Sequence, residues 1–229
     1  MSDYVIAPPV TAALPIKGSS QMFPVRRIFC VGRNYAEHAI EMGHDPNKEP
    51  PFFFQKNPDN LLPADQAFPY PPKSEDVHFE LELVVALKGG GTNVPVERAM
   101  DLVYGYAVGL DMTRRDLQGE AKKLGRPWEI GKAFEHSAPC GPIVPAEKVG
   151  QLTRGAVILE VNGEIRQKGD VNQMIWKIPE MISYLSDYFT LAPGDIIMSG
   201  TPAGVGAVKR GDQMRGVVEG VGELTVRVV

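Results

Sequence analysis

The stretch HFELELVVAL, from His78 to Leu87, places two glutamates inside an otherwise apolar run. In a β-strand, residues two positions apart project from the same face, so Glu80, Glu82 and His78 are expected to point to one side. Two carboxylates side by side on a half-buried strand repel each other, and a basic partner, a proton or a metal cation must neutralise them. A solvated face with both glutamates in water is the plainer interpretation of such a pair.

A third carboxylate favours a metal site over a solvated face. Asp111 ends the apolar run YAVGLD, where it can meet the two glutamates across a sheet. Three carboxylates with few soft ligands nearby describe an oxygen-only site, of the kind that Mg²⁺, Mn²⁺ or Ca²⁺ prefers. His78 could in principle join them and shift the preference toward iron or zinc, although a lone histidine is more often structural.

The elements that must position these side chains are mostly strands. The run VILEVNGEIRQ carries Asn162-Gly163 between two alternating segments, and a type I′ hairpin turn requires this kind of dipeptide. Other expected strands are RRIFCVG, PPFFFQK before a turn at Asn57-Pro58-Asp59, GYAVGLDMT and the C-terminal runs around GTPAGVG. Strands without a regular βαβ rhythm predict a β-rich α+β fold and argue against a doubly wound sheet.

Helices are expected at four places. The patterns are NYAEHAIEMG with Asn34 as N-cap, PVERAMDLVY, RRDLQGEAKKLG and IPEMISYLSDYF. The last pattern places five apolar residues on one helical stripe, at Ile178, Met181, Ile182, Leu185 and Phe189. Residues 1–24 are expected to form an extended N-terminal arm, followed by a single catalytic domain over 25–229.

Composition excludes some classes of partner. The 229 residues have a formal net charge of −4 and no long basic run, so we expect no nucleic-acid partner. No apolar run approaches the ~20 residues of a membrane span, and no secretory signal is visible, so the cytoplasm is the expected location. Cys30 and Cys140 fit no metal or redox spacing and are expected to be free, buried thiols.

Taken together, the motifs resemble those of a known family. FCVGRNYAEHAIEMG, PFFFQKNPDNL, HFELELVV, GYAVGLDMTRRDLQ, RPWEIGKAF, VNGEIRQ and GDIIMSGTPAGVG follow one another in the order seen in the fumarylacetoacetate hydrolase superfamily. Within it, the chain is most similar to the short bacterial acylpyruvate hydrolases. The resemblance implies a mixed β-roll of the C-terminal-domain type that forms a homodimer through its sheets, with Mg²⁺ or Mn²⁺ held by Glu80, Glu82 and Asp111.

The resemblance also implies roles for further residues. His38 and Glu41, three positions apart on one helical face, would activate water from a lid helix within a mobile segment over Asn34–Asn47. Lys132 would face the metal-bound oxygens. The implied substrate-binding residues are Arg33, Arg115, Gln118 and Thr201. The GTPAGVG loop is not a phosphate loop, because no Lys-Ser/Thr pair follows its glycines.

The function that the resemblance implies is metal-dependent hydrolysis of the C–C bond of an acylpyruvate. The leading substrate is fumarylpyruvate, cleaved to fumarate and pyruvate in aromatic catabolism. Two alternatives stay open. An oxaloacetate decarboxylase of the same fold would use the same metal without an attacking water, and a non-catalytic module could keep the carboxylates for a structural Ca²⁺.

Overall fold

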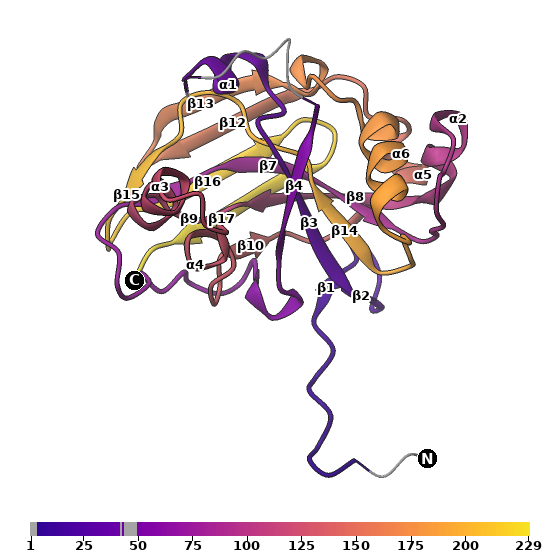
Figure 1. Cartoon of the computed structure of the whole chain (residues 1–229), viewed down its shortest axis with the longest axis horizontal. Coiled ribbons are helices and arrows are strands. Elements are labelled where there is room, and N and C mark those ends of the chain that lie inside the picture. The colour runs from indigo at the N-terminus through magenta and orange to yellow at the C-terminus, as the bar shows by residue number, and fades with distance from the viewer. Residues whose placement is uncertain (1–3, 42, 44–49) are drawn as a thin grey trace.

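The structure is a computed structural model that describes residues 4–41, 43 and 50–229. Its largest unit is an eight-stranded mixed sheet (Figure 1), in which β14 pairs in parallel with β3, and β10 with β5, while the other pairs are antiparallel. The seven strands of its main path are, in spatial order, β4 (Phe52–Lys56), β3 (Arg27–Gly32), β14 (Asp195–Met198), β7 (Leu81–Leu87), β8 (Val103–Leu110), β10 (Ala138–Cys140) and β5 (Leu61–Pro63). The short β11 (Val144–Pro145) pairs with β8 off this path.

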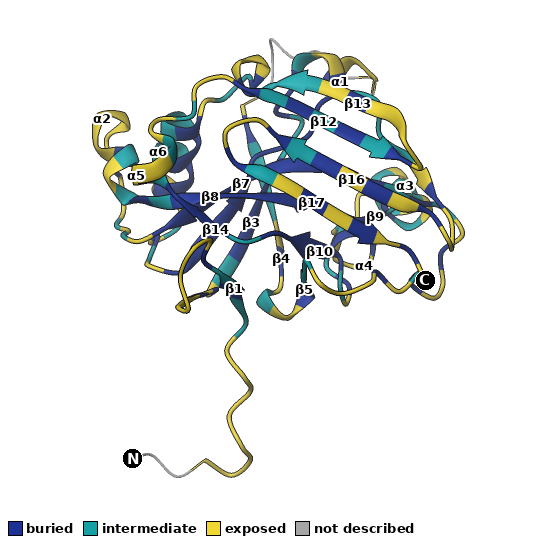
Figure 2. Ribbon diagram, turned by 180° about the vertical axis from the view of Figure 1, so that it is seen from behind, coloured by how far each residue is buried: buried dark blue, intermediate teal, exposed yellow. Residues whose placement is uncertain are grey.

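A second, four-stranded antiparallel sheet packs against the first. Its strands are, in order, β13 (Glu164–Asp170), β12 (Ala156–Val161), β16 (Gln213–Val218) and β17 (Gly222–Arg227). Figure 2 shows buried and exposed residues alternating along these strands, as expected for a sheet with one face on the core. Asn162 and Gly163 both have positive φ, at 54° and 83°, which confirms the predicted turn between β12 and β13.

The predicted strand from His78 to Leu87 is divided between two sheets. β6 (Val77–Phe79) lies in a three-stranded sheet between β15 (Gly206–Val208) and β9 (Thr113–Arg114), whereas β7 lies in the large sheet. Glu80 is the residue between them. His78 and Glu82 therefore belong to different sheets, which removes the simple alternation that placed them on one face.

The N-terminal segment is extended only in part. The side chains of Val5 and Val10 are almost fully exposed, and Figure 1 shows this stretch leading away from the body of the molecule. Closer to the domain, β1 (Ala13–Pro15) and β2 (Met22–Pro24) form a two-stranded antiparallel sheet. Leu14 and Phe23 are buried there in a core cluster, so these strands are packed rather than free.

The helices are short and lie around the sheets. They are α1 (Ala36–Glu41), α2 (Val96–Ala99), α3 (Arg115–Lys123), α4 (Glu129–Lys132), α5 (Ala146–Val149) and α6 (Ile178–Tyr188), with 3₁₀ turns at Pro58–Asn60, Met100–Leu102 and Val171–Gln173. Four of the five predicted stripe residues of α6 are buried, while Phe189 follows the end of the helix. Among the described residues, no helix is long and apolar enough to cross a membrane.

Asn34 does not cap α1, contrary to the prediction. The helix begins two residues later, and the Asn34 amide instead donates to the carbonyl oxygens of Trp176 and Ser199 and accepts from the Trp176 N–H. It therefore ties the start of this segment to two other parts of the fold. Strands dominate the architecture, and the predicted β-rich mixed fold is confirmed.

Candidate active site

Three acidic residues meet where β7 and β8 lie side by side. The antiparallel register pairs Leu81 with Leu110, so Glu80, just before β7, lies beside Asp111, just after β8. The Asp111 N–H donates to the Glu80 carbonyl at 2.9 Å, which fixes this approach. Glu80, Glu82 and Asp111 are all buried, and each offers a carboxylate oxygen within 4.8 Å of the others. The sequence prediction that these three carboxylates converge is correct.

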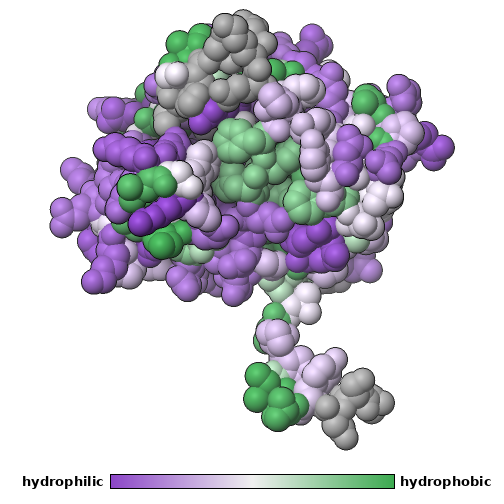
Figure 3. Space-filling model, in the orientation of Figure 1, coloured by the Kyte–Doolittle hydropathy of each residue, from purple (hydrophilic) through white to green (hydrophobic). Residues whose placement is uncertain are grey.

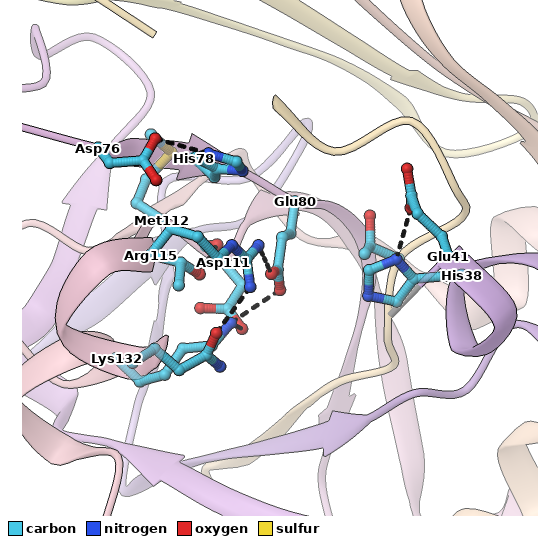
Figure 4. A network of polar contacts seen from close by, with 12 residues as sticks. His38, Glu41, Asp76, His78, Glu80, Asp111, Met112, Arg115 and Lys132 are labelled. Atoms are coloured by element: carbon cyan, nitrogen blue, oxygen red, sulfur yellow. Dashed lines mark hydrogen bonds and ion pairs between the residues drawn. The ribbon is translucent and has the colours of Figure 1, made fainter. Parts of the chain in front are cut away.

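Two cations, the buried Lys132 and the half-buried Arg115, compensate part of this charge. Lys132 Nζ lies 2.8 Å from Glu80 Oε2 and 2.7 Å from Asp111 Oδ2, and Arg115 lies 2.5 Å from Glu80 Oε1 (Figure 4). Burial alone would raise the pKa of Glu80, but Lys132 and Arg115 outweigh it and hold that pKa below its usual range. Burial would lower the pKa of Lys132, but the carboxylates of Asp111 and Glu80 raise it, so this amine stays charged.

Glu82 is compensated least. Burial, and then the nearby carboxylates of Asp111 and Glu80, raise its pKa well above the usual value. The Gly200 N–H donates to its Oε2 at 2.9 Å, and this is a neutral donor. An added cation beside Glu82 would supply the charge that the surrounding protein does not.

Lys56 is a member of the site that sequence reasoning missed. It is 1% exposed, its ammonium lies 2.9 Å from Asp111 Oδ1, and it donates to the carbonyl oxygens of Met112 and Lys132. It thereby holds the chain after Asp111 against α4. The sequence did hold a signal for Lys56, because Phe52, Phe54 and Lys56 alternate along β4 and share one face of that strand. The two phenylalanines line a cavity that Glu80, Glu82 and Asp111 also line.

The donor set fits a hard divalent ion. The three converging ligands are all carboxylate oxygens, which suits Mg²⁺, Mn²⁺ or Ca²⁺ better than soft metals. Asp111 Oδ1 is buried and lies 2.9 Å from the Lys56 ammonium, and the second lone pair of this oxygen stays available to a metal. His78 takes no part in this cluster: its Nε2 lies 2.8 Å from Asp76 Oδ1, and Figure 4 shows this pair apart from the carboxylates that contact Lys132.

The predicted water-activating pair is present on α1. His38 Nδ1 lies 3.1 Å from Glu41 Oε2, and His38 lines the same cavity as the acidic residues. The Gly204 N–H donates to both carboxylate oxygens of Glu41, at 3.2 and 3.3 Å, which ties α1 to the GTPAGVG loop. Figure 4 shows His38 across from Asp111 with Glu80 between them. Of the expected lid segment Asn34–Asn47, residues 42 and 44–47 lie outside the described residues.

The residues expected to bind substrate are gathered at the cavity. Its lining includes Arg33, Arg115, Gln118 and Thr201. Arg115 donates to Gln118 Oε1 at 2.7 Å, so these two side chains fix each other's position in the cavity wall. Thr201 Oγ1 accepts from Gln167 Nε2 at 2.8 Å, which fixes the hydroxyl at the start of the glycine-rich loop. Their contacts with a substrate remain a proposal.

Comparison of the sequence with known protein families identifies the family of this chain. A family model described as the C-terminal domain of fumarylacetoacetate (FAA) hydrolase matches residues 27–229. The chain belongs to this family. The resemblance inferred from the motif series is therefore correct, and the three acidic residues, Lys132 and the His38–Glu41 pair all lie within the matched region.

Relatives within the family carry more than one name. A fumarylpyruvate hydrolase from Ralstonia sp. is 46% identical over 184 residues, which cover 80% of this chain and 95% of that protein. A mitochondrial oxaloacetate decarboxylase from Dictyostelium discoideum is 39% identical over 196 residues, covering 86% and 90%. The crystal structure of fumarylpyruvate hydrolase from Pseudomonas aeruginosa in complex with Mn²⁺ and pyruvate has a TM-score of 0.97 and 54% identity, covering 99% of both chains.

Proposed function

We propose that the chain hydrolyses acylpyruvates, with fumarylpyruvate as the leading substrate, and that it requires Mg²⁺ or Mn²⁺. The observation that carries the proposal is the placement of a His–Glu pair and three converging carboxylates around one cavity. The similarity to a fumarylpyruvate hydrolase whose structure holds Mn²⁺ and pyruvate supports both the reaction and the metal. Glu80, Glu82 and Asp111 are the proposed ligands.

The reaction breaks the bond between the acyl carbonyl carbon and the methylene carbon of the pyruvoyl part. The oxygen of water bonds to the acyl carbon, and the bonding electrons leave on the methylene carbon as the enolate of pyruvate, which then takes up a proton. When bound, a divalent ion would polarise the pyruvoyl oxygens and stabilise the negative charge of that enolate. The protein must therefore supply a base for the water and a fixed position for both ends of the substrate.

His38 is the proposed general base. With Nδ1 donating to Glu41, its other ring nitrogen is left to accept a proton from water, and the Glu41 carboxylate stabilises the imidazolium that forms. The proton taken from water balances the one that the methylene carbon receives. Lys132 keeps Glu80 and Asp111 in place and puts a positive charge beside the cavity where negative charge develops. Arg115, Gln118 and Thr201 would orient the pyruvoyl end.

A second candidate is decarboxylation of oxaloacetate, supported by the relative that carries this name. That reaction also leaves the enolate of pyruvate, but it needs no attacking water and so would leave the His38–Glu41 pair without a task. Rates on fumarylpyruvate and on oxaloacetate, measured side by side with Mg²⁺ and with Mn²⁺, separate the two. We expect faster turnover of fumarylpyruvate. A protein that is inactive on every acylpyruvate yet fast on oxaloacetate would make decarboxylation the function.

We further propose that the chain works as a homodimer in the cytoplasm. Val5, Ile6 and Val10 are apolar and strongly exposed, so a partner surface would remove them from water. Both cysteines are buried free thiols, as is usual in a reducing compartment. Light scattering on the purified protein tests the assembly: we expect twice the chain mass of 25.0 kDa, and the chain mass alone would contradict it.

A further inference from the structure

The lining of the cavity differs from side to side in what it offers to a ligand. Along β4 it is aromatic, with Phe52, Phe54 and Trp128, and Figure 3 shows apolar side chains gathered over the position of this strand. Such rings bury the flat parts of a ligand but provide few hydrogen bonds to its oxygens. Hydrogen-bond donors must come from other parts of the lining, and Thr201, in the GTPAGVG loop, supplies a neutral hydroxyl there.

A buried amide stands behind this hydroxyl. Gln167 is fully buried in β13, whose other side chains are exposed or partly exposed, and β13 is the outer strand of the four-stranded sheet. The single buried position of such a strand normally holds an apolar side chain, because burying an amide costs free energy unless its hydrogen bonds are made. Glutamine at this position points to a task for its polar atoms.

The contacts of Gln167 fix the orientation of its amide. Its Oε1 accepts from the Leu81 N–H at 3.0 Å, and its Nε2 donates to the Pro202 carbonyl oxygen and to Thr201 Oγ1, both at 2.8 Å. A backbone N–H only donates and a carbonyl oxygen only accepts, so exchanging the amide oxygen and nitrogen would break both backbone contacts. The second amide proton therefore goes to the Thr201 hydroxyl, whose oxygen acts as the acceptor.

Thr201 is left with its own proton to offer. A hydroxyl carries one proton and two acceptor lone pairs, and Gln167 occupies one of these lone pairs. Within residues 4–41, 43 and 50–229, no acceptor takes the Thr201 hydroxyl proton. Thr201 is 2% exposed and lines the cavity, so this proton is available to a ligand oxygen inside it.

The strand β13 also supports the loop through its backbone. A Cβ at Gly169 would lie 2.7 Å from the Cβ of Pro202, closer than two such atoms can come, so glycine lets the strand and the loop meet. The Gln167 amide in turn holds Leu81, the residue between the two glutamates of the site. One side chain therefore joins the loop that carries Thr201 to the strand that carries acidic ligands.

We propose that Gln167 is a positioning residue, which directs the Thr201 hydroxyl proton into the cavity to bind a carboxylate oxygen at the pyruvoyl end of the substrate. Only the identity of the ligand rests on the proposed function, because the direction of the hydroxyl follows from the contacts of Gln167. A hydrogen bond donated to a carboxylate is stronger than one between neutral groups, so its direction affects affinity. Gln167 does not line the cavity and acts through Thr201.

A change of Gln167 that keeps its shape should turn the hydroxyl away. The amide nitrogen donates two hydrogen bonds, whereas a glutamate oxygen in its place donates one at most, and the Pro202 carbonyl takes that proton because it can only accept. The Thr201 hydroxyl then donates to the glutamate. We expect Gln167→Glu to weaken oxalate binding to the Mn²⁺-loaded protein about 10- to 100-fold, the range for one lost hydrogen bond to a charged group, as measured by calorimetry. Gln173→Glu is the matched control, because Gln173 is exposed and uses only its Oε1, as an acceptor.

Substitutions of Thr201 separate positioning from structural damage and from the added charge. Thr201→Val keeps the shape of the side chain and removes the hydroxyl. In this background Gln167→Glu should change oxalate affinity by less than about 2-fold, because no hydroxyl is left to turn. In the Thr201→Ser background, which keeps a hydroxyl, the full loss should return. A loss of equal size in the natural and Thr201→Val backgrounds, or no loss in the natural one, would overturn the proposal.

A second variant and the choice of oxalate keep the outcome decisive. If Gln167→Glu does not fold, Gln167→Met, which has neither charge nor donor, replaces it in the same comparison, with the same expected pattern and the same contradicting results. Oxalate binding is measured without turnover. If no acylpyruvate is hydrolysed, the proposed function fails, while the dependence of the Gln167 effect on the Thr201 hydroxyl still decides this inference.

Discussion

Glu82 is the acidic residue whose charge depends most on a bound cation. Glu80 is paired with Lys132 and Arg115, and Asp111 with Lys132 and Lys56, whereas Glu82 receives a hydrogen bond from a backbone N–H. We predict that Glu82→Ala weakens Mn²⁺ binding by at least about 100-fold, because outer-shell partners of a metal site already cost ~10- to 100-fold. Equilibrium dialysis with metal analysis measures this. Full metal occupancy in Glu82→Ala, matching the exposed-surface control Glu164→Ala, would show that the ligands lie elsewhere.

At the scale of elements, the position of α1 depends on the GTPAGVG loop, whose Gly204 N–H donates to the Glu41 carboxylate. Gly204 has a φ of 93°, and a Cβ there would lie 2.2 Å from the Arg166 carbonyl oxygen, so an alanine must displace the loop. Gly211 has a φ of 94° with open space around it, which makes it a matched control. We predict that Gly211→Ala costs about 1–2 kcal/mol of stability from its φ alone, whereas Gly204→Ala costs more and also lowers kcat. Thermal unfolding and turnover of both variants measure this; equal effects would mean that the loop does not position Glu41.

The sequence predicted elements well where the signal is local. The hairpin at Asn162-Gly163 and the buried stripe of α6 follow from turn chemistry and from a 3.6-residue period, and both are present. The break at Glu80, which divides the run His78–Leu87 between β6 and β7, could not be predicted from the sequence. An alternating pattern is the same whichever sheet a strand joins. The partners β15 and β14 that decide it come from more than a hundred residues away along the chain.

At the scale of the whole molecule, sequence motifs predicted some residues of the site and missed those that only tertiary packing brings there. Spacing and family resemblance located Glu80, Asp111 and His38, because their motifs are contiguous in sequence. Lys56 and Lys122 were missed, since a lysine in a sequence is normally solvated and only tertiary packing shows that one is buried beneath Asp111 and the other seated on a tryptophan ring. Buried polar residues of this kind are set by the assembled fold.

Metal binding should stabilise the whole chain. A ligand at 100 times its dissociation constant adds about 2.7 kcal/mol to the free energy of unfolding, which corresponds to a Tm increase of roughly 5–11 °C at this chain length. We predict that Mn²⁺ raises the Tm by this amount, that a chelator reverses it, and that Glu82→Ala abolishes it. Calorimetric scans with and without Mn²⁺ provide the measurement. An unchanged Tm at saturating Mn²⁺ would argue that the acidic residues hold no ion in the folded state.

The central claim is that His38, held by Glu41, activates water beside a carboxylate metal site. The measurement that tests it most directly is kcat for fumarylpyruvate hydrolysis by His38→Ala at saturating substrate and Mn²⁺, with oxalate affinity determined on the same preparation as a check of the pyruvoyl site. We predict that kcat falls by ~10²–10⁴, the contribution of a lost general base, while oxalate and Mn²⁺ still bind as they do to the natural protein. The kcat of Glu41→Gln should lie between those of the natural protein and His38→Ala, because glutamine keeps a hydrogen-bond partner for the imidazole but removes the negative charge. Unchanged hydrolysis by His38→Ala would contradict the account and move water activation away from α1.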